Sequence, residues 1–262
     1  MDRIIDFHNH IFPEKIARRV TEFLAGYYEF DPEGTGELDD LLASSHSAGM
    51  SKLIVHSTAT RASQVKSVNI YLRDVVAEQK GYFVGFGTMH PDFEDIEGEL
   101  KSIVSYGLRG LKLHPDFQEF CIDSDKMYKI YEAVGDSLPI LVHVGDKKAD
   151  ASSPERMARA VRDFPNVTFI AAHFGGYSNW DDAYEYLAGK DLYFDTSSTL
   201  QFLPADDAMR IIRKHGVEKM LFGSDYPMSS HAESLRLFYK LPLSYEEQEL
   251  ILYKNAGKLL KL

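Results

Sequence analysis

The feature that most constrains the fold is an eightfold alternation between short apolar runs and longer stretches with helical periodicity. The apolar runs are rich in β-branched and aromatic residues and are bounded by Gly, Pro, Asn or Asp, which is typical of strands. We expect strands at about residues 4–7, 53–57, 82–87, 110–113, 139–144, 167–172, 192–195 and 220–222. Helices are expected between them, for example at residues 63–79, 94–106, 125–134, 154–163, 180–187 and 204–215. Such alternation indicates parallel βαβ units.

Eight βαβ units in 262 residues predict one closed (β/α)8 TIM barrel, a single domain over residues 1–262, because barrels of this kind have about 250 residues. The alternative is a doubly wound open sheet, which usually carries a Gly-rich phosphate turn after its first strand. Here the first strand is followed by His8-Asn9-His10. Residues 29–37 are expected to belong to a long loop with Tyr27 and Tyr28, and residues 245–260 to form a closing helix.

The net charge of −11 argues against a nucleic-acid or anionic-membrane binder, because phosphate groups require a basic surface. No run approaches the roughly 18 apolar residues of a membrane span, and the N-terminus shows no secretory signal. The single cysteine, Cys121, fits a reducing compartment. We therefore expect a cytoplasmic protein whose partner is a small molecule.

Seven of the ten histidines lie in or just after an expected strand: His8, His10, His56, His90, His114, His143 and His173. Asp225 follows the eighth strand in the same way. The carboxyl ends of all barrel strands meet on one face, so these side chains should gather there. Packed imidazoles and carboxylates need a common partner, and a metal ion is the economical one.

His8 and His10 are the sharpest local signal, because side chains alternate along a strand and these two point to the same side. With His143 and Asp225 at two other strand ends, they predict a site for one divalent metal ion. Three imidazoles and one carboxylate suit Zn²⁺ best, with Mn²⁺, Fe²⁺ or Co²⁺ as alternatives.

Five segments carry a family resemblance: residues 6–10 (DFHNH), 110–115 (GLKLHP), 141–145 (LVHVG), 171–176 (AAHFGG) and 222–227 (FGSDYP). With them the chain resembles the amidohydrolase superfamily, in the amidohydrolase-related branch that includes aminocarboxymuconate-semialdehyde decarboxylase. The resemblance implies a distorted barrel with one main metal and suggests a homodimer. It implies that the four residues above are the ligands, and that His173 is the catalytic histidine.

Each implied role has a physical reason. A bound divalent metal can lower the pKa of a coordinated water to about 7. Asp225 could accept the proton of that water, and His173 could orient the water or polarise a substrate oxygen. The alternative for His173 is a core histidine bonded to the backbone of the following turn, and the alternative for Asp225 is a turn cap.

Three further residues are candidates for substrate binding: Arg61, Lys112 and His114. Arg61 could clamp a substrate carboxylate through two parallel hydrogen bonds. Lys112 is expected to be a cation near the site, for an anionic substrate group or a neighbouring carboxylate. A carboxylated Lys112 that bridges two metals, as in some members of the superfamily, is the alternative. A second, weaker metal held partly by His114 is also left open.

The neighbours of these residues leave further alternatives. Which of His56 and Ser57 faces inward depends on the strand register. Asp195 could bond a ligand histidine or a backbone amide.

The leading functional hypothesis is a metal-dependent hydrolase that acts on an amide, ester or lactone of a small, anionic organic acid. The alternative is non-oxidative decarboxylation of a small unsaturated or aromatic acid. The resemblance favours hydrolysis slightly, because the aromatic-acid decarboxylases often have Glu at the position of His8. A TatD-type nuclease would carry a Glu ligand after the third strand, where this chain has His90. A purely structural zinc site would have no use for His173 and Lys112.

Overall fold

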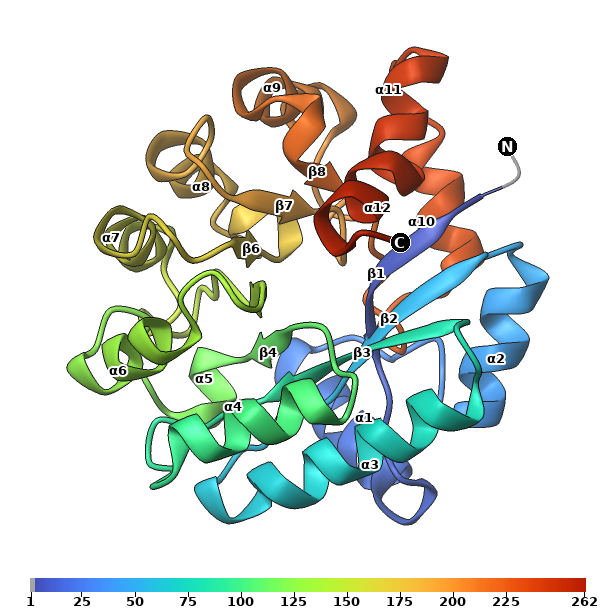
Figure 1. The fold of residues 1–262 in the computed structure, drawn as a ribbon. Coiled ribbons are helices and arrows are strands. Elements are labelled where there is room, and N and C mark those ends of the chain that lie inside the picture. Colours follow the sequence, from blue (N-terminus) through green and yellow to red (C-terminus); the bar gives the residue numbers. More distant parts are fainter. Residues whose placement is uncertain (1–2) are drawn as a thin grey trace.

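The computed structural model describes residues 3–262, and its centre is a parallel sheet of eight strands in sequential order (Figure 1). The strands are β1 (Ile5–His10), β2 (Lys52–His56), β3 (Phe83–Thr88), β4 (Leu111–Leu113), β5 (Ile140–Val142), β6 (Phe169–Ala171), β7 (Tyr193–Asp195) and β8 (Met220–Leu221). Each pairs with its sequence neighbour in parallel. The predicted (β/α)8 TIM barrel is confirmed.

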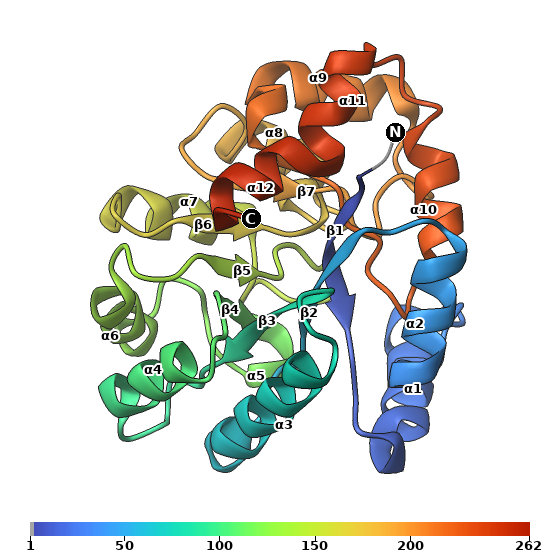
Figure 2. The ribbon, with the colours of Figure 1, turned by 45° about the vertical axis from the view of Figure 1, so that its right-hand side comes forward.

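Helices surround the sheet in both views (Figures 1 and 2). They are α1 (Glu14–Tyr28), α2 (Leu38–Ser47), α3 (Val65–Glu78), α4 (Ile96–Ser105), α5 (Pro115–Gln118), α6 (Asp125–Val134), α7 (Pro154–Asp163), α8 (Trp180–Tyr186), α9 (Ala205–His215), α10 (His231–Phe238), α11 (Tyr245–Glu249) and α12 (Asn255–Leu260). None of the helices in the described residues is long and apolar enough to cross a membrane.

One local prediction needs correction. Tyr27 and Tyr28 lie in the last turn of α1 and not in a loop, because the chain turns back only at Glu29, which adopts a left-handed φ of 63°. The closing helix predicted at residues 245–260 is confirmed, and α11 and α12 continue into each other through a π-helical segment at Leu250–Lys254.

One end of the barrel is filled and covered. An apolar cluster inside it combines residues of six strands with the last helix: Ile5, Phe7, Ile54, Val84, Phe86, Leu141, Ile170, Leu221, Ala256 and Leu260 among them. In Figure 1 the red helix α12 lies over this end of the barrel, and Asn255 donates hydrogen bonds to the carbonyls of Val217 and Met220 there, both at 2.8 Å. The opposite end, where the strands terminate, is therefore the open one.

A bulge in β1 changes which side chains point into the barrel. The pairing of β1 with β2 shifts register between Asp6 and Asn9. Phe7 and His8 both lie within the bulge: Phe7 belongs to the inner apolar cluster, whereas His8 lies beside His10, which lines the open end. The Asp6 carboxylate holds this irregular backbone, since its Oδ1 accepts the N–H groups of His8 and Ser224, both at 3.0 Å.

The barrel closes between β8 and β1 by scattered hydrogen bonds instead of a regular ladder. Phe7 N–H donates to the carbonyl of Phe222 at 2.8 Å, and Asp225 N–H donates to the carbonyl of His8 at 3.0 Å. This seam is the distortion that the family resemblance implies. It also attaches the backbone of Asp225 directly to the strand that carries His8.

Candidate metal centre

The open end gathers most of the residues that the sequence singled out. His8, His10, His56, Lys112, His114, His143, His173, Asp195 and Asp225 are buried or nearly so there. Arg61 is exposed and lies at the rim, before the short helical turn Ala62–Gln64. The expected convergence of strand ends is thus observed, with Arg61 apart from the buried cluster.

The Nε2 atom of His8 is the centre of the cluster. His8 Nδ1 donates to Asp195 Oδ2 at 2.8 Å, so its Nε2 carries a lone pair. That lone pair is 3.3 Å from His10 Nε2, 3.1 Å from Asp225 Oδ1 and 3.0 Å from Lys112 Nζ. Lys112 Nζ can donate a hydrogen bond to that lone pair, and Asp225 Oδ1 and His10 Nε2 lie close enough to share a bound cation with it.

His143 and His173 form a second contact that needs a cation or a shared proton. His143 Nε2 donates to the carbonyl of Gly145 and His173 Nδ1 to the carbonyl of Ser197, each at 3.0 Å. The remaining nitrogens, His143 Nδ1 and His173 Nε2, then face each other without a hydrogen at 2.9 Å. Ligand atoms of His173, His8 and Asp225 lie within 4.8 Å of one another, and His143 joins this group through His173.

Asp225 divides its two oxygens between the cluster and the protein. Oδ1 faces His8 and lies 3.5 Å from His10 Nε2, whereas Oδ2 accepts a short hydrogen bond from the Ser198 hydroxyl. Both Asp225 and His173 adopt left-handed backbone angles, with φ of 73° and 61°. Such angles are uncommon outside glycine and concentrate at functional sites.

Asp195 forms hydrogen bonds with a histidine and with backbone amides, so both of the roles considered for it from the sequence are observed. Its Oδ2 accepts from His8, and its Oδ1 accepts the N–H groups of His173 at 2.9 Å and Ser197 at 3.1 Å. The Ser197 hydroxyl also donates to Oδ1. One buried carboxylate on β7 therefore orients residues that follow β6 and lie on β1.

Burial keeps the imidazoles neutral and ready to bind a cation. It lowers the pKa of His8 to about 3, with the charge of Lys112 adding to the effect, and lowers the pKa of His10 as well. Burial also takes the pKa values of His114 and His143 well below the usual range. Burial by itself would raise the pKa of Asp225, but His8 and His10 bring it below the usual range.

Lys112 is completely buried beside His8, and burial lowers the pKa of its ammonium group to about 8. The carboxylates of Asp195 and Asp225 act in the opposite direction and favour the charged form. Within residues 3–262, the lining of the large cavity described next does not include Lys112. The structure thus places Lys112 beside His8 in the buried cluster, and its contact with an anionic substrate group stays a prediction.

A cavity of about 1350 Å³ opens above the cluster. His10, His143, His173, Ser198 and Asp225 form its polar floor. Helix α1 forms one wall, with apolar and aromatic side chains that include Ile16, Val20, Phe23, Leu24, Tyr27 and Tyr28. Arg61 and His114 also line it.

His114 and Asp116 form a polar patch at the edge of this cavity. The His114 ring stacks on that of His143 with centroids 4.0 Å apart, and Tyr28 Oη lies 3.3 Å from His114 Nε2. Neither oxygen of the buried Asp116 carboxylate has a hydrogen-bond partner in the described chain, and burial raises its pKa to about 6. His143 Nε2, the atom 4.0 Å from Asp116, already donates to a carbonyl. This patch therefore fits a substrate with hydrogen-bond donors better than a second metal.

The residues fit a divalent metal. His8, His10 and Asp225 supply nitrogen and carboxylate donors that lie within 3.5 Å of one another, and such donors suit Zn²⁺, Mn²⁺, Fe²⁺ or Co²⁺. The predicted ligand His143 reaches this group only through His173, so its role as a ligand stays a prediction.

Sequence reasoning missed Ser198 and Asp116. Both are polar residues just after a strand, Ser198 in Asp195-Thr196-Ser197-Ser198 and Asp116 in His114-Pro115-Asp116, and that position could have flagged them.

The comparisons with known proteins agree with this geometry. The family model described as amidohydrolase matches residues 5–262. The chain belongs to the amidohydrolase family. The search of curated proteins found no match.

Solved structures with the same fold are distant in sequence. An uncharacterised TIM-barrel protein from Bordetella bronchiseptica has 20% identity and a TM-score of 0.79, covering 99% of this chain and 98% of that one. A dihydroxybenzoic acid decarboxylase from Polaromonas with bound manganese has 16% identity, a TM-score of 0.77 and coverage of 100% and 98%. A candidate 2-pyrone-4,6-dicarboxylic acid hydrolase from Pseudomonas putida has 17% identity, a TM-score of 0.70 and coverage of 100% and 98%. At these identities the likeness is one of fold.

Replacing Asp195 should weaken metal binding without unfolding the barrel. Asp195→Asn keeps the shape but removes the charge that holds the His8 Nδ1 proton, and partners of this kind typically contribute about 10–100-fold to metal affinity. We expect a loss of that size in Zn²⁺ affinity, measured by competition with a chromophoric chelator. Asp191→Asn, an exposed change close by, is the control. Equal affinities for both variants would contradict this role.

The metal-free protein should lose stability as the pH falls below about 6.5. Burial lowers the pKa values of His8, His10, His56, His114 and His143, so the unfolded chain binds more protons than the folded chain below 6.5. Asp6 and Asp116, whose pKa values burial raises to about 7 and 6, act in the opposite direction but are fewer. We expect a lower urea midpoint at pH 5 than at pH 7.5. A midpoint that rises on acidification would be inconsistent with neutral, buried imidazoles.

Proposed function

We propose that this chain is a metal-dependent enzyme that hydrolyses an amide, ester or lactone of a small, carboxylate-bearing organic acid. The observation that carries the proposal is the convergence of His10 and Asp225 on His8 Nε2, next to a large cavity. When bound there, a divalent metal polarises a substrate carbonyl and makes a water more acidic. Zn²⁺ is the metal we propose, with Mn²⁺ as the alternative.

The rim of the cavity supports an anionic substrate. Lys15, Arg19 and Arg61 all line it, and none of them forms an ion pair within residues 3–262. Unpaired cations at one opening stand out in a chain with a net charge of −11. They attract an anion to this opening, and the planar Arg61 group can bind a carboxylate through two hydrogen bonds.

The floor residues can move protons at the reacting atoms. Asp225 lies between His8, His10 and the Ser198 hydroxyl, so it can accept a proton while Ser198 holds its second oxygen. His173 has its Nδ1 proton tied to the carbonyl of Ser197, which leaves Nε2 to take up a proton and pass it to a leaving group. Both side chains line the cavity.

Decarboxylation of an aromatic acid is the second candidate. Aromatic rings line the cavity, among them Phe23, Tyr28, Phe117 and Tyr177, and form a surface on which a flat ring can stack. Similar folds include a 5-carboxyvanillate decarboxylase from Sphingomonas paucimobilis and the dihydroxybenzoic acid decarboxylase above. In this reaction His173 would deliver a proton to the ring carbon that loses carbon dioxide.

The first test combines metal content with product analysis. Protein purified without chelator should hold about one Zn²⁺ or Mn²⁺ per chain by mass spectrometry, and His8→Ala/His10→Ala should hold none. We then offer lactones, esters, amides and hydroxylated aromatic acids in ¹⁸O-labelled water. Hydrolysis incorporates ¹⁸O into the acid product and releases no carbon dioxide. Carbon dioxide release favours the second candidate, and a wild-type protein without metal or turnover contradicts both.

Arg61 should act on substrate affinity. Arg61→Ala removes a bidentate partner for a carboxylate, and we expect KM to rise about tenfold, which is about 1.4 kcal/mol, with little change in kcat. Arg73→Ala is the matched control, because Arg73 is paired with Asp74 and does not line the cavity. A substrate analogue without the carboxylate should show no difference between wild type and Arg61→Ala. An unchanged KM for the acid would rule out this contact.

A further inference from the structure

His56 is a buried imidazole with no partner for either nitrogen. It is the last residue of β2, it is completely buried, and neither Nδ1 nor Nε2 makes a hydrogen bond in the described part of the chain. Burying a polar group without a hydrogen-bond partner destabilises the folded state. A histidine with two such nitrogens is therefore less favourable here than an apolar side chain, if the only role of the side chain is to fill the core.

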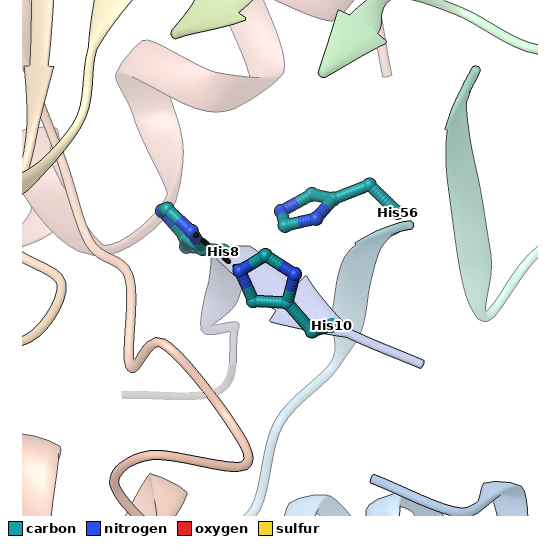
Figure 3. Close-up of side chains that lie close together, drawn as sticks. All are labelled: His8, His10 and His56. Atoms are coloured by element: carbon teal, nitrogen blue, oxygen red, sulfur yellow. Dashed lines mark hydrogen bonds between the residues drawn. The ribbon is translucent and has the colours of Figure 1, made fainter. Parts of the chain in front are cut away.

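The position of His56 points its ring at the metal cluster. Its Cα pairs with that of His10 across the β1–β2 ladder, and Figure 3 shows its ring facing His8 and His10. The ring centroids are 4.5 Å from His10 and 4.9 Å from His8, and one nitrogen from each of the three rings lies within 4.8 Å of the others. The register thus resolves the open question of whether His56 or Ser57 belongs to the cluster.

In the described chain, His56 does not line the large cavity in which a substrate would bind. The lining of the large cavity, over residues 3–262, includes Ser57 and His10 but neither His56 nor His8. These two histidines lie on the closed side of the cluster. A cation between the three histidine rings would give His56 the partner that it lacks.

We infer that His56 is a further ligand of the metal, a third imidazole beside His8 and His10. This inference rests on the proposed metal-dependent function. Imidazole nitrogens bind Zn²⁺ at about 2.0–2.1 Å, so neighbouring ligands lie about 3–4 Å apart, and the 3.3 Å between His8 and His10 already fits. His8, His10 and His56 would then hold the ion together, and of the neighbouring residues His10 and Asp225 line the cavity.

A third imidazole changes which metal the site prefers. Imidazole nitrogen suits Zn²⁺, whereas Mn²⁺ favours sites richer in oxygen ligands. His56 should therefore raise the preference of this chain for Zn²⁺ over Mn²⁺. Removing it should weaken Zn²⁺ binding more than Mn²⁺ binding.

The test uses His56→Leu, with His56→Gln as a second variant if the first does not fold. Because the ring makes no hydrogen bond, metal-free His56→Leu should unfold at the same temperature as wild type or higher. We expect its Zn²⁺ affinity to fall at least tenfold in chelator competition and its Mn²⁺ affinity to fall less. The visible absorption of Co²⁺-loaded protein should also change, because it reports the ligand set directly.

The matched control is His215→Leu. His215 is also a buried histidine whose Nε2 has no hydrogen-bond partner in the described chain. It is the last residue of α9 and its ring stacks on that of Phe194, away from the cluster. Its loss should leave Zn²⁺ affinity and the Co²⁺ spectrum unchanged.

Two adverse outcomes are distinguishable. If His56→Leu and His56→Gln keep wild-type Zn²⁺ affinity and Co²⁺ absorption while His8→Ala/His10→Ala loses the metal, His56 is not a ligand and the proposed function stands. If wild type itself binds neither Zn²⁺ nor Mn²⁺, the proposed function fails, and the role of His56 fails with it.

Discussion

The hydrogen bond from His8 Nδ1 to Asp195 Oδ2 is the interaction on which the rest of the site depends. It fixes the tautomer of His8 and leaves the lone pair of Nε2 directed at Asp225, His10 and Lys112. The same carboxylate accepts the backbone N–H of His173. A single buried charge therefore sets the geometry of residues from three strands, and its own burial is offset by the hydrogen bonds it receives.

The irregular parts of the barrel are the parts that build the site. The bulge in β1 places His8 beside His10, which lines the open end, and the seam between β8 and β1 ties Asp225 to the backbone of His8. His173 and Asp225 occupy left-handed backbone conformations that cost free energy in a non-glycine residue. The regular remainder of the barrel, filled by large apolar residues and covered by α12, supplies the stability that holds these conformations.

The regular elements could be predicted well from the sequence. The expected bounds of α6 and α7 match the structure, and all eight strands were found, because each strand is buried and bounded by turn residues. The aromatic end of α1 was wrongly placed in a loop. Several apolar residues of this helix face the cavity and not the protein core, so its sequence lacks the pattern of a helix packed on a core. The bulge at Asp6 could not be foreseen, because its cause is a pair of hydrogen bonds, one of them to Ser224, 218 residues away.

The sequence by itself determined the fold class and the gathering of histidines at one end of the barrel. Both follow from local patterns, because alternating strands and helices impose a parallel barrel and parallel strands terminate on the same face. Only the tertiary structure decided which nitrogen of His8 carries its proton, that Lys112 lies beside His8, and that His56 faces His8 and His10. Those facts depend on register and on hydrogen bonds between residues far apart in the chain, and no local pattern encodes such contacts.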